Sequence, residues 1–361
     1  MSTGLAQRRS AELEELIERD ASQFRILTGD RPTGPLHLGH YFGTLRNRVR
    51  LQDIGAEVFV LIADYQVLTD RDLAEHLDEY VTGLVLDYLA IGLDPARTVV
   101  FAHSAVPALN QLLLPFLSLV SVPELQRNPT VKDEIAHSRQ SAVSGLMLTY
   151  PAHQAADILF CKANLVPVGQ DQLPHLELTR VIARRFNGRY GAPVFPVPDA
   201  LLSAAPLLLG IDGTKMSKSR GNAIALAASA DETAGLIRGA KTDAERYVSY
   251  DPERRPEVSN LVLLAALALG RSPQDVVADL GTGGAAALKA TVTMAVNELL
   301  APVRARRAEY ARDLGYVRQV LREGNERAEA IAASTLDEVR ATGHALLRRA
   351  SPVAGLGPWT S

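Results

Sequence analysis

The chain has 361 residues, of which 47% are hydrophobic and 22% charged, and its net charge is −3. This length can hold two domains, one of them large enough to bury an α/β core. The mild acidity argues against a protein that coats nucleic acid through bulk charge, so we expect local RNA contact at most and no DNA partner. Cys161 is the single cysteine, which excludes an internal disulfide and a cysteine-rich metal site, and we predict no protein-bound metal.

Membrane and export signals are also missing from the sequence pattern. No stretch approaches about 18 uninterrupted apolar residues, the length of a membrane span. The first 20 residues carry interspersed arginine and glutamate, so they lack the apolar centre of a secretion signal. We therefore expect a cytoplasmic protein without membrane contact.

The first two thirds of the chain alternate between strand and helix patterns. A short amphipathic helix is predicted over residues 10–19 and is expected to serve packing. Strands are predicted at 24–28, 58–63, 98–102 and 165–168, and helices at 38–52, 72–93 and 172–186. This alternation predicts a Rossmann-type α/β fold, a parallel sheet with helices on both faces.

The pattern changes after Gly221, where alanine-rich helical stretches replace the strand signals. Such stretches cover residues 284–300, 303–323 and 325–349. We expect an N-terminal helical extension (1–22), a Rossmann-type domain (23–221), an all-helical domain (222–350) and a flexible tail (351–361).

A pair of histidines follows the first predicted strand. His37 and His40 lie three apart, after a Gly/Pro-rich turn, at the end of the sheet where such folds bind ligands. The amides of a helix start already favour an anion there. Two imidazoles can add hydrogen bonds to triphosphate oxygens as charge develops on them. The alternative is that these histidines only cap or pack the helix.

A second motif, Lys215-Met216-Ser217-Lys218-Ser219, lies far downstream, in front of Arg220-Gly221. Its two lysines are three apart and offer ammonium groups to a leaving pyrophosphate, so they can act mainly in the transition state. Mg²⁺ is expected with the triphosphate, held mainly by phosphates and water. The alternative is a solvated basic loop.

Together, His-Leu-Gly-His and Lys-Met-Ser-Lys-Ser, in this order, resemble the ATP-activating signature of class I aminoacyl-tRNA synthetases. The resemblance implies that His37, His40, Lys215 and Lys218 are catalytic. It further implies ATP contacts from Arg31, Pro32, Thr33, Gly39, Gly169, Gln170, Asp171, Met216, Ser217 and Ser219.

A candidate amino-acid pocket lies between the two motifs. Tyr150, Gln154 and Asp157 fall on one helical face, and Pro151 is expected in the first turn of that helix. A carboxylate on such a face needs a partner, and an indole N–H or a phenol O–H would serve, as would an internal arginine. Gln172 is placed to meet the substrate ammonium or a ribose, unless it and Asp171 only cap the next helix.

Longer segments narrow the resemblance to tryptophanyl-tRNA synthetases. Similar stretches run from about residue 24 to 325 and include 128–132, 149–159, 164–172 and 175–180. The family implies a homodimer that makes tryptophanyl-adenylate from L-tryptophan and MgATP and then esterifies tRNA(Trp). It also implies that Asp157 binds the indole nitrogen.

Several positions depart from the family pattern. Many members have Thr-Ile-Gly-Asn at 37–40, glutamine at Arg31, histidine at Gln66 and methionine at Gln154. Tyr150, Gln154 and Asp157 are also similar to the tyrosine-binding pattern of tyrosyl-tRNA synthetases, and a buried polar pair discriminates strongly. A tyrosine-specific ligase and an adenylate-forming paralogue with another acceptor therefore stay open, with Gln66 among the predicted amino-acid contacts.

The RNA side has no electrostatic footprint in the sequence. Residues 222–361 contain 17 Lys+Arg and 17 Asp+Glu. Arg304, Arg306 and Arg307 form the densest basic group, and both anticodon contact and a solvated helical face are compatible with it.

Overall fold

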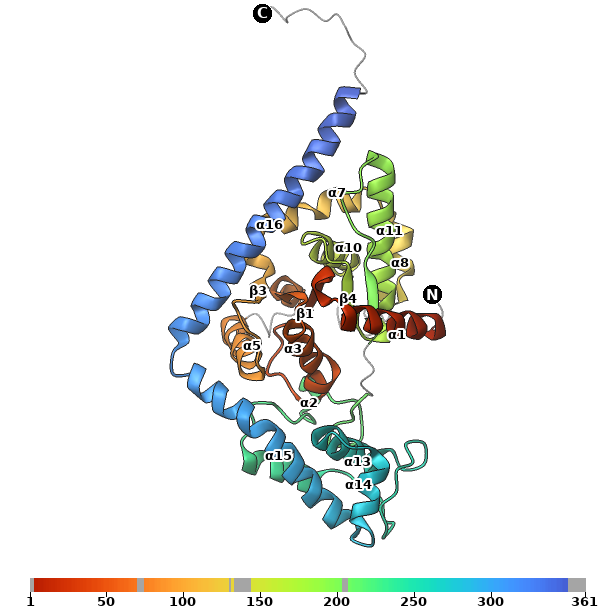
Figure 1. The fold of residues 1–361 in the computed structure, drawn as a ribbon, viewed down its shortest axis with the longest axis vertical. Coiled ribbons are helices and arrows are strands. Elements are labelled where there is room, and N and C mark those ends of the chain that lie inside the picture. The colour runs from red at the N-terminus through yellow and green to blue at the C-terminus, as the bar shows by residue number, and fades with distance from the viewer. Residues whose placement is uncertain (1–2, 70–74, 130, 133–143, 203–206, 350–361) are drawn as a thin grey trace, which may run out of the picture. The chain divides into compact units, whose positions relative to one another are not determined.

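The computed structural model describes residues 3–69, 75–129, 131–132, 144–202 and 207–349 (Figure 1). The chain divides into two compact units. The described residues of Met1–Thr28, Phe101–Leu202 and Gly324–Ser361 form the first unit, and those of Gly29–Val100 and Ser203–Glu323 form the second. The predicted tail, 351–361, lies outside the described residues.

The strands form one five-stranded sheet in the order β3-β2-β1-β4-β5. Their bounds are β1 Arg25–Asp30, β2 Glu57–Ile62, β3 Thr98–Ala102, β4 Leu165–Val168 and β5 Asp199–Leu202. β4 runs parallel to both β1 and β5. The Rossmann-type prediction is confirmed, and β2 and the edge strand β3 are buried along almost their whole length, as expected where helices cover both faces of a parallel sheet. β5 was not predicted, because Asp-Ala-Leu-Leu lacks the β-branched and aromatic residues that mark strands.

The first unit surrounds β4 and β5 with helices (Figure 1). Its elements are α1 Thr3–Arg19, η1 Ala21–Gln23, η4 His103–Ala105, α6 Pro107–Gln111, α7 Leu113–Leu117, α8 Val122–Arg127, α10 Gly145–Leu159, η5 Gln170–Gln172, α11 Leu173–Tyr190 and the later part of α16 Leu314–Arg349. α1 lies along β5, where Ser10 Oγ accepts a hydrogen bond from Leu202 N (2.9 Å). This N-terminal helix therefore completes the packing of the sheet edge.

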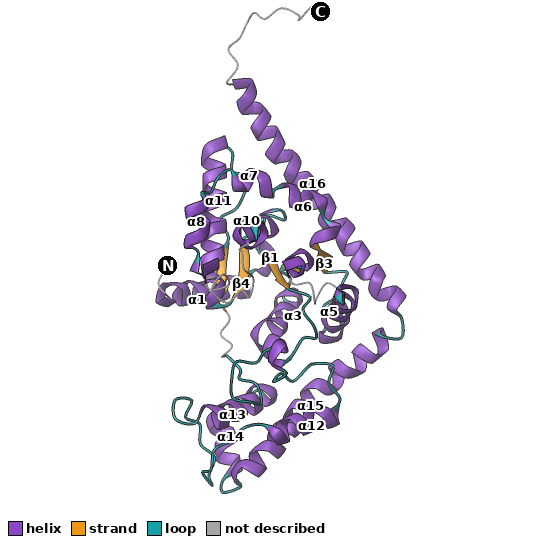
Figure 2. Cartoon of the chain, turned by 180° about the vertical axis from the view of Figure 1, so that it is seen from behind, coloured by secondary structure: helices purple, strands orange, loops and turns teal. Residues whose placement is uncertain are grey.

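The second unit contains β2 and most of the remaining helices (Figure 2). These are α2 Leu38–His40, η2 Tyr41–Leu45, α3 Arg46–Asp53, η3 Asp64–Thr69, α5 Leu77–Ile91, η6 Lys218–Arg220, α12 Ala230–Gly239, α13 Pro256–Leu269, α14 Pro273–Leu280 and α15 Gly284–Tyr310. α13 packs on α14 and α15, and α15 packs on α5. The described elements after Gly221 are all helical, which confirms the expected change of character.

Two prolines lie inside helices, although the sequence pattern placed Pro151 in a first helical turn and left Pro302 in a gap between two helical stretches. α10 begins at Gly145, capped by Ser144, whose Oγ accepts a hydrogen bond from Met147 N (3.1 Å), so Pro151 lies inside the helix. α15 likewise continues through Pro302, and the break falls at 311–313. A proline removes one intrahelical hydrogen bond, but burial of the neighbouring Leu300 and Val303 outweighs that cost.

Among the described residues, no single helix is long and apolar enough to cross a membrane. One pair, Pro256–Leu269 with Pro273–Leu280, passes that length and composition test only when taken together, and it is bent by 106°.

Candidate functional site

Two histidines begin helix α2 and cap it reciprocally. His37 Nδ1 accepts a hydrogen bond from Gly39 N (3.1 Å), and His40 Nδ1 accepts one from His37 N (3.2 Å). An imidazole nitrogen that accepts a backbone N–H carries no proton, so in each neutral ring the proton sits on Nε2. Capping and ligand binding are therefore not alternatives here, because capping uses Nδ1 and leaves the Nε2–H as donor.

Both rings favour the neutral state. Burial lowers the pKa of His37 to about 3, and the nearby charges of His40 and Lys218 act in the same direction. Burial also lowers the pKa of His40 to about 4, although the carboxylate of Asp30 opposes the shift. At neutral pH the pair thus offers hydrogen-bond donors without carrying charge.

The glycine between the histidines is needed for this arrangement. A Cβ at Gly39 would lie 3.0 Å from the Nδ1 and Cε1 atoms of His37. Gly34, in the preceding turn, has a φ of +123°, which side chains rarely adopt. Glycines therefore permit both the close approach of the two tilted rings, whose centroids lie 3.8 Å apart, and the turn that precedes them.

The lysine loop is joined to the histidine segment inside the second unit. Leu38 N donates to Ile224 O (3.0 Å) and Leu226 N donates to Leu36 O (2.9 Å), which makes a short antiparallel bridge. Lys218 Nζ donates to Gly34 O (2.8 Å), so this ammonium is held against the turn in front of His37. Burial lowers the pKa of Lys218, an effect that Asp30 and Asp87 oppose.

The other residues of the loop are placed differently. Lys215 is exposed, Met216 is buried and Ser217 is half-buried, while the side chain of Ser219 lies outside what the structure describes. Asn222 fastens the loop: its Nδ2 donates to Asp212 Oδ1 (2.8 Å), and its Oδ1 accepts from Ser217 N (2.8 Å). The structure therefore brings Lys218, and not the side chain of Lys215, to the histidines.

An ion pair between Asp30 and Arg48 lies next to the turn that follows β1. Asp30 Oδ2, at the end of β1, accepts hydrogen bonds from Arg48 Nη1 (2.5 Å) and Tyr88 Oη (2.7 Å). Burial would raise the pKa of Asp30, but Arg48 and the hydrogen bonds more than offset it and lower that pKa to about 2. The carboxylate is thus ionised and committed to Arg48, whose side chain is only 2% exposed.

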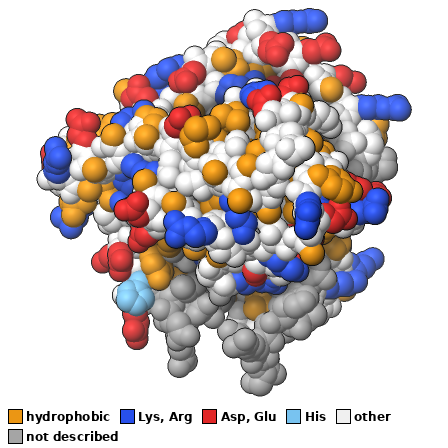
Figure 3. All heavy atoms as spheres, turned by 90° about the horizontal axis from the view of Figure 1, so that it is seen from below, with side chains coloured by type: hydrophobic (Ala, Val, Ile, Leu, Met, Phe, Trp, Pro, Cys, Tyr) orange, Lys and Arg blue, Asp and Glu red, His pale blue; other side chains and the backbone are white. Residues whose placement is uncertain are grey.

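The basic group on α15 is largely used inside the second unit. Arg307 Nε donates to Asp87 Oδ1 (2.7 Å) and Arg306 Nε donates to Ala90 O (2.6 Å), both on α5. Arg304 donates to Asn297 and Thr233. On the face drawn in Figure 3, basic and acidic side chains are interspersed. These arginines therefore join α15 to α5 and α12, although Arg306 remains exposed.

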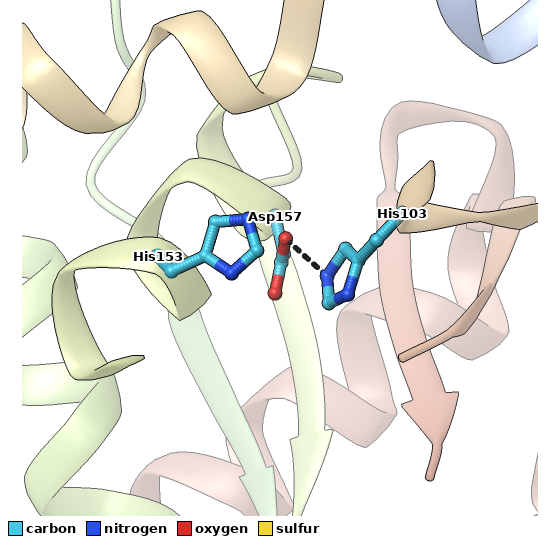
Figure 4. Close-up of side chains that lie close together, drawn as sticks. All are labelled: His103, His153 and Asp157. Atoms are coloured by element: carbon cyan, nitrogen blue, oxygen red, sulfur yellow. Dashed lines mark hydrogen bonds and ion pairs between the residues drawn. The ribbon is translucent and has the colours of Figure 1, made fainter. Parts of the chain in front are cut away.

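The predicted amino-acid pocket lies in the first unit. Asp157 on α10 is buried, and its Oδ1 lies 2.8 Å from His103 Nε2 (Figure 4). The partner of Asp157 is thus His103 and not the internal arginine that the sequence left open. One helical turn before Asp157, Gln154 is half-buried.

Tyr150, at the beginning of the same helical face, belongs to a chain of polar groups. Its Oη lies 3.1 Å from His175 Nε2, and His175 Nδ1 lies 3.2 Å from Asn128 Nδ2. Burial lowers the pKa of His175 to about 4, so this ring is neutral at pH 7. An amide nitrogen donates, so the proton of His175 sits on Nε2 and Tyr150 Oη accepts it.

The remaining predicted contacts fall on short segments after strands. In the first unit, Gly169 follows β4, and Gln170 and Asp171 are exposed in η5. Gln172 Nε2 donates to Asp171 Oδ2 (3.0 Å), and no side chain caps α11, so the capping alternative is not observed. In the second unit, the turn after β1 carries Arg31 (exposed), Pro32 (buried) and Thr33 (half-buried), and η3 carries Gln66 (half-buried).

The sequence analysis did not single out several polar residues, namely the half-buried Asp30 and the buried Arg48, His103, His153 and His175. Asp30 ends β1 and His103 directly follows β3, the position where parallel sheets place ligand-binding groups. A polar residue directly after each buried strand was the signal that would have found these two.

The geometry of both motifs can now be compared with known proteins. Residues 19–301 match the family of class I tRNA synthetases (W and Y). The chain is 43% identical to a tryptophan–tRNA ligase of Streptococcus agalactiae over 330 residues, which cover 87% of this chain and 96% of that protein. The chain belongs to this synthetase family.

Solved structures of related synthetases have the same fold. The tryptophanyl-tRNA synthetase of Campylobacter jejuni, complexed with ADP and tryptophan, aligns with a TM-score of 0.77 at 28% identity, covering 89% of this chain and 99% of that one. A tyrosyl-tRNA synthetase of Archaeoglobus fulgidus, complexed with L-tyrosine, aligns with a TM-score of 0.63 at 25% identity, covering 82% and 93%. This synthetase is thus more similar to the first of these two.

Proposed function

We propose that this synthetase is a tryptophan–tRNA ligase that activates L-tryptophan with MgATP and transfers it to tRNA(Trp). One observation supports ATP activation above all. His37 and His40 cap the helix that follows the glycine-rich turn, and Lys218 donates a hydrogen bond to Gly34 in that turn. The choice of tryptophan is supported by relatives with 41–43% identity that are named tryptophan–tRNA ligase. A tyrosine-specific ligase is less well supported, since the tyrosyl neighbour is less similar than the tryptophanyl one.

In the first step the tryptophan carboxylate attacks the α-phosphorus of ATP. The bond between the α-phosphorus and the bridging oxygen breaks, and pyrophosphate leaves with that electron pair. The Nε2–H groups of His37 and His40 donate to phosphate oxygens that gain charge, and Lys218 neutralises the leaving pyrophosphate. Lys215, Met216, Ser217 and Ser219 are proposed to complete the nucleotide contacts as the loop closes on the triphosphate.

Mg²⁺ enters as part of the MgATP substrate. The negative charge of Asp30 raises the pKa of both histidine rings and of Lys218. Its carboxylate already accepts hydrogen bonds from Arg48 and Tyr88. This donor set fits a magnesium ion held by phosphate oxygens and water better than one held by side chains. When bound, the ion would neutralise charge on the triphosphate.

The other ligands are assigned from the predicted contacts. Asp157 is proposed to accept the indole N–H, with Tyr150, Gln154, Gln172 and Gln66 around the rest of the amino acid. Arg31, Pro32, Thr33 and Gly39 are proposed to contact ATP, and Gly169, Gln170 and Asp171 to hold its ribose and base.

The proposed function also includes a site for the tRNA acceptor and assembly into a dimer. The helical residues 222–350 are proposed as the anticodon-binding domain that follows the catalytic domain, 23–221. We propose a homodimer and a cytoplasmic location, because aminoacyl-tRNA is used there.

The acceptor is tested by aminoacylation of purified tRNA. We expect the enzyme to attach tryptophan to tRNA(Trp) and not to attach tyrosine to tRNA(Tyr). Adenylate formation without any tRNA esterification would overturn the ligase assignment and favour a paralogue with another acceptor.

A further inference from the structure

Two buried histidines that the proposed reaction does not use lie beside Asp157 (Figure 4). His153 and Asp157 are four residues apart and project from the same face of α10, while His103 comes from η4, directly after β3. The side chains of His103 and Asp157 are 0% and 2% exposed. Both side chains are therefore almost completely shielded from water.

The contact between His103 and Asp157 has a defined donor and acceptor. An ionised carboxylate only accepts hydrogen bonds, so His103 Nε2 must carry the proton in the 2.8 Å contact with Asp157 Oδ1. Burying a carboxylate without a hydrogen-bond donor costs free energy, so this contact matters for the stability of the site. His103 thus keeps Asp157 an acceptor and holds one of its two oxygens.

A second layer fixes the histidines themselves. Asn110 Nδ2 donates to the carbonyl oxygens of His103 (2.8 Å) and Val106 (3.0 Å), which defines the orientation of the amide. Asn110 Oδ1 must then accept from His153 Nε2, at 2.8 Å. The ring of His153 lies against that of His103, with centroids 4.6 Å apart. Asn110 therefore anchors both the backbone of one histidine and the ring of the other.

Two histidines and an aspartate are also the residue types that bind zinc, and the ligand atoms of these three lie within 4.8 Å of one another. However, two ligands on one tetrahedral zinc ion are about 3.3 Å apart, given metal–ligand bonds near 2.0 Å. The 2.8 Å separation of His103 Nε2 and Asp157 Oδ1 is shorter and is that of a direct hydrogen bond, so these two atoms are placed as a hydrogen-bonded pair and not as two zinc ligands.

We infer that His103 is a specificity-determining positioning residue that presents the second oxygen of Asp157 to a hydrogen-bond donor on the aromatic side chain of the substrate. This inference rests on the proposed tryptophan–tRNA ligase activity. Since His103 engages Oδ1, Oδ2 is the atom that accepts the indole N–H. An aromatic substrate without a ring donor leaves that buried oxygen unpaired and is rejected.

The test uses amino-acid-dependent pyrophosphate exchange by the full-length enzyme. Tryptophan is compared with its benzothienyl analogue, 3-(3-benzothienyl)alanine, in which sulfur replaces the ring N–H. The variants are His103→Leu, which removes the donor, and His103→Gln, whose amide nitrogen restores it. His76→Leu changes an exposed histidine on the second unit and is the matched control.

We expect His103→Leu to raise KM for tryptophan about tenfold or more while activity with the analogue changes less than about threefold. His103→Gln should stay within about threefold of the wild type for both substrates, since a neutral donor is sufficient. The His76→Leu control should leave both substrates unchanged.

An equal loss with both substrates, or an unchanged preference for tryptophan, would overturn the inference while the wild type still exchanges with tryptophan. A wild type that does not exchange with tryptophan would instead overturn the proposed function, and the inference with it. If His103→Leu does not fold, His103→Asn, which keeps a polar group but is too short to reach Asp157, is compared with His103→Gln in its place. Equal kinetics of these two variants would likewise overturn the inference.

Discussion

Lys218 reaches back across the sequence and donates its Nζ proton to the carbonyl oxygen of Gly34, 2.8 Å away. The lysine loop is therefore fastened to the turn that precedes His37. In the proposed reaction, Lys218 would exchange this hydrogen bond for contacts to the phosphates of ATP. Such an exchange favours an effect on the transition state over an effect on ATP affinity.

Replacement of Lys218 by alanine is expected to lower kcat of pyrophosphate exchange about 10²–10³-fold, the usual effect of removing one transition-state donor. KM for ATP should change less than about fivefold, because ground-state binding retains its other contacts. Lys289→Ala is the matched control, since Lys289 also donates to a backbone carbonyl (Arg238 O, 2.9 Å) but lies on α15. A rise in KM for ATP with unchanged kcat would contradict this role of Lys218.

The double variant His37→Thr, His40→Asn is expected to keep pyrophosphate exchange within about tenfold of the wild type. Threonine can cap the helix through its hydroxyl, as His37 does through Nδ1, and the asparagine amide can donate to a phosphate as the Nε2–H of His40 does. His37→Ala, His40→Ala removes cap and donors and should lose about 10²–10³-fold. Steady-state pyrophosphate exchange is measured for both double variants. Equal activity of the two would show that the side chains at positions 37 and 40 do not act in catalysis.

Acid should destabilise the wild type more than it destabilises the His37→Thr, His40→Asn variant. Both histidines have a lowered pKa in the folded protein, so their stabilising effect is complete above the unfolded value of about 6.5. It is lost progressively as pH falls from there to about 4 for His40 and about 3 for His37. Between pH 7 and 4.5 we expect the wild type to lose more unfolding free energy than the variant, about 2 kcal/mol for each histidine and about 4–5 kcal/mol for the pair. Urea unfolding at both pH values measures this, and parallel losses would mean that the folded histidines take up protons freely.

Replacement of Asp30 by asparagine is expected to destabilise the protein by about 3–5 kcal/mol, because it leaves the guanidinium of Arg48 buried without a carboxylate. Asp279→Asn breaks the exposed pair with Arg271 and should cost less than about 1 kcal/mol. Unfolding in urea at pH 7 compares the two. The pKa of Asp30 is lowered, so the stabilisation is present above about pH 4 and is lost as pH falls through about 2. A cost for Asp30→Asn as small as that of the control would contradict the buried-pair account.

Local patterns were sufficient for most of the fold. Buried strands such as β2 are continuous apolar runs, and the helix that begins at Leu38 follows a turn rich in glycine and proline. β5 escaped prediction because four residues with little strand character are held by their neighbours β4 and α1. Pro151 was expected in a first helical turn and Pro302 in a gap between helices, but tertiary burial, which no local pattern reports, keeps both inside helices.

In the candidate site, too, residues that belong to local motifs could be predicted, whereas contacts between residues distant in sequence could not. His37, His40 and Lys218 are marked by contiguous motifs, so their identity could be predicted, whereas the pairing of Lys218 with Gly34 joins residues 184 positions apart. Asp157 was found from its spacing on α10. Its partner His103 was not, because it lies 54 residues away and no helical period connects the two.

Amino-acid-dependent pyrophosphate exchange, measured with each of the twenty common amino acids, tests the central claim most directly. The account predicts exchange with tryptophan and a kcat/KM for tryptophan at least about 10³-fold above that for tyrosine, in line with the discrimination that buried polar pockets reach. Exchange with tyrosine alone, or with none of the amino acids, would contradict it.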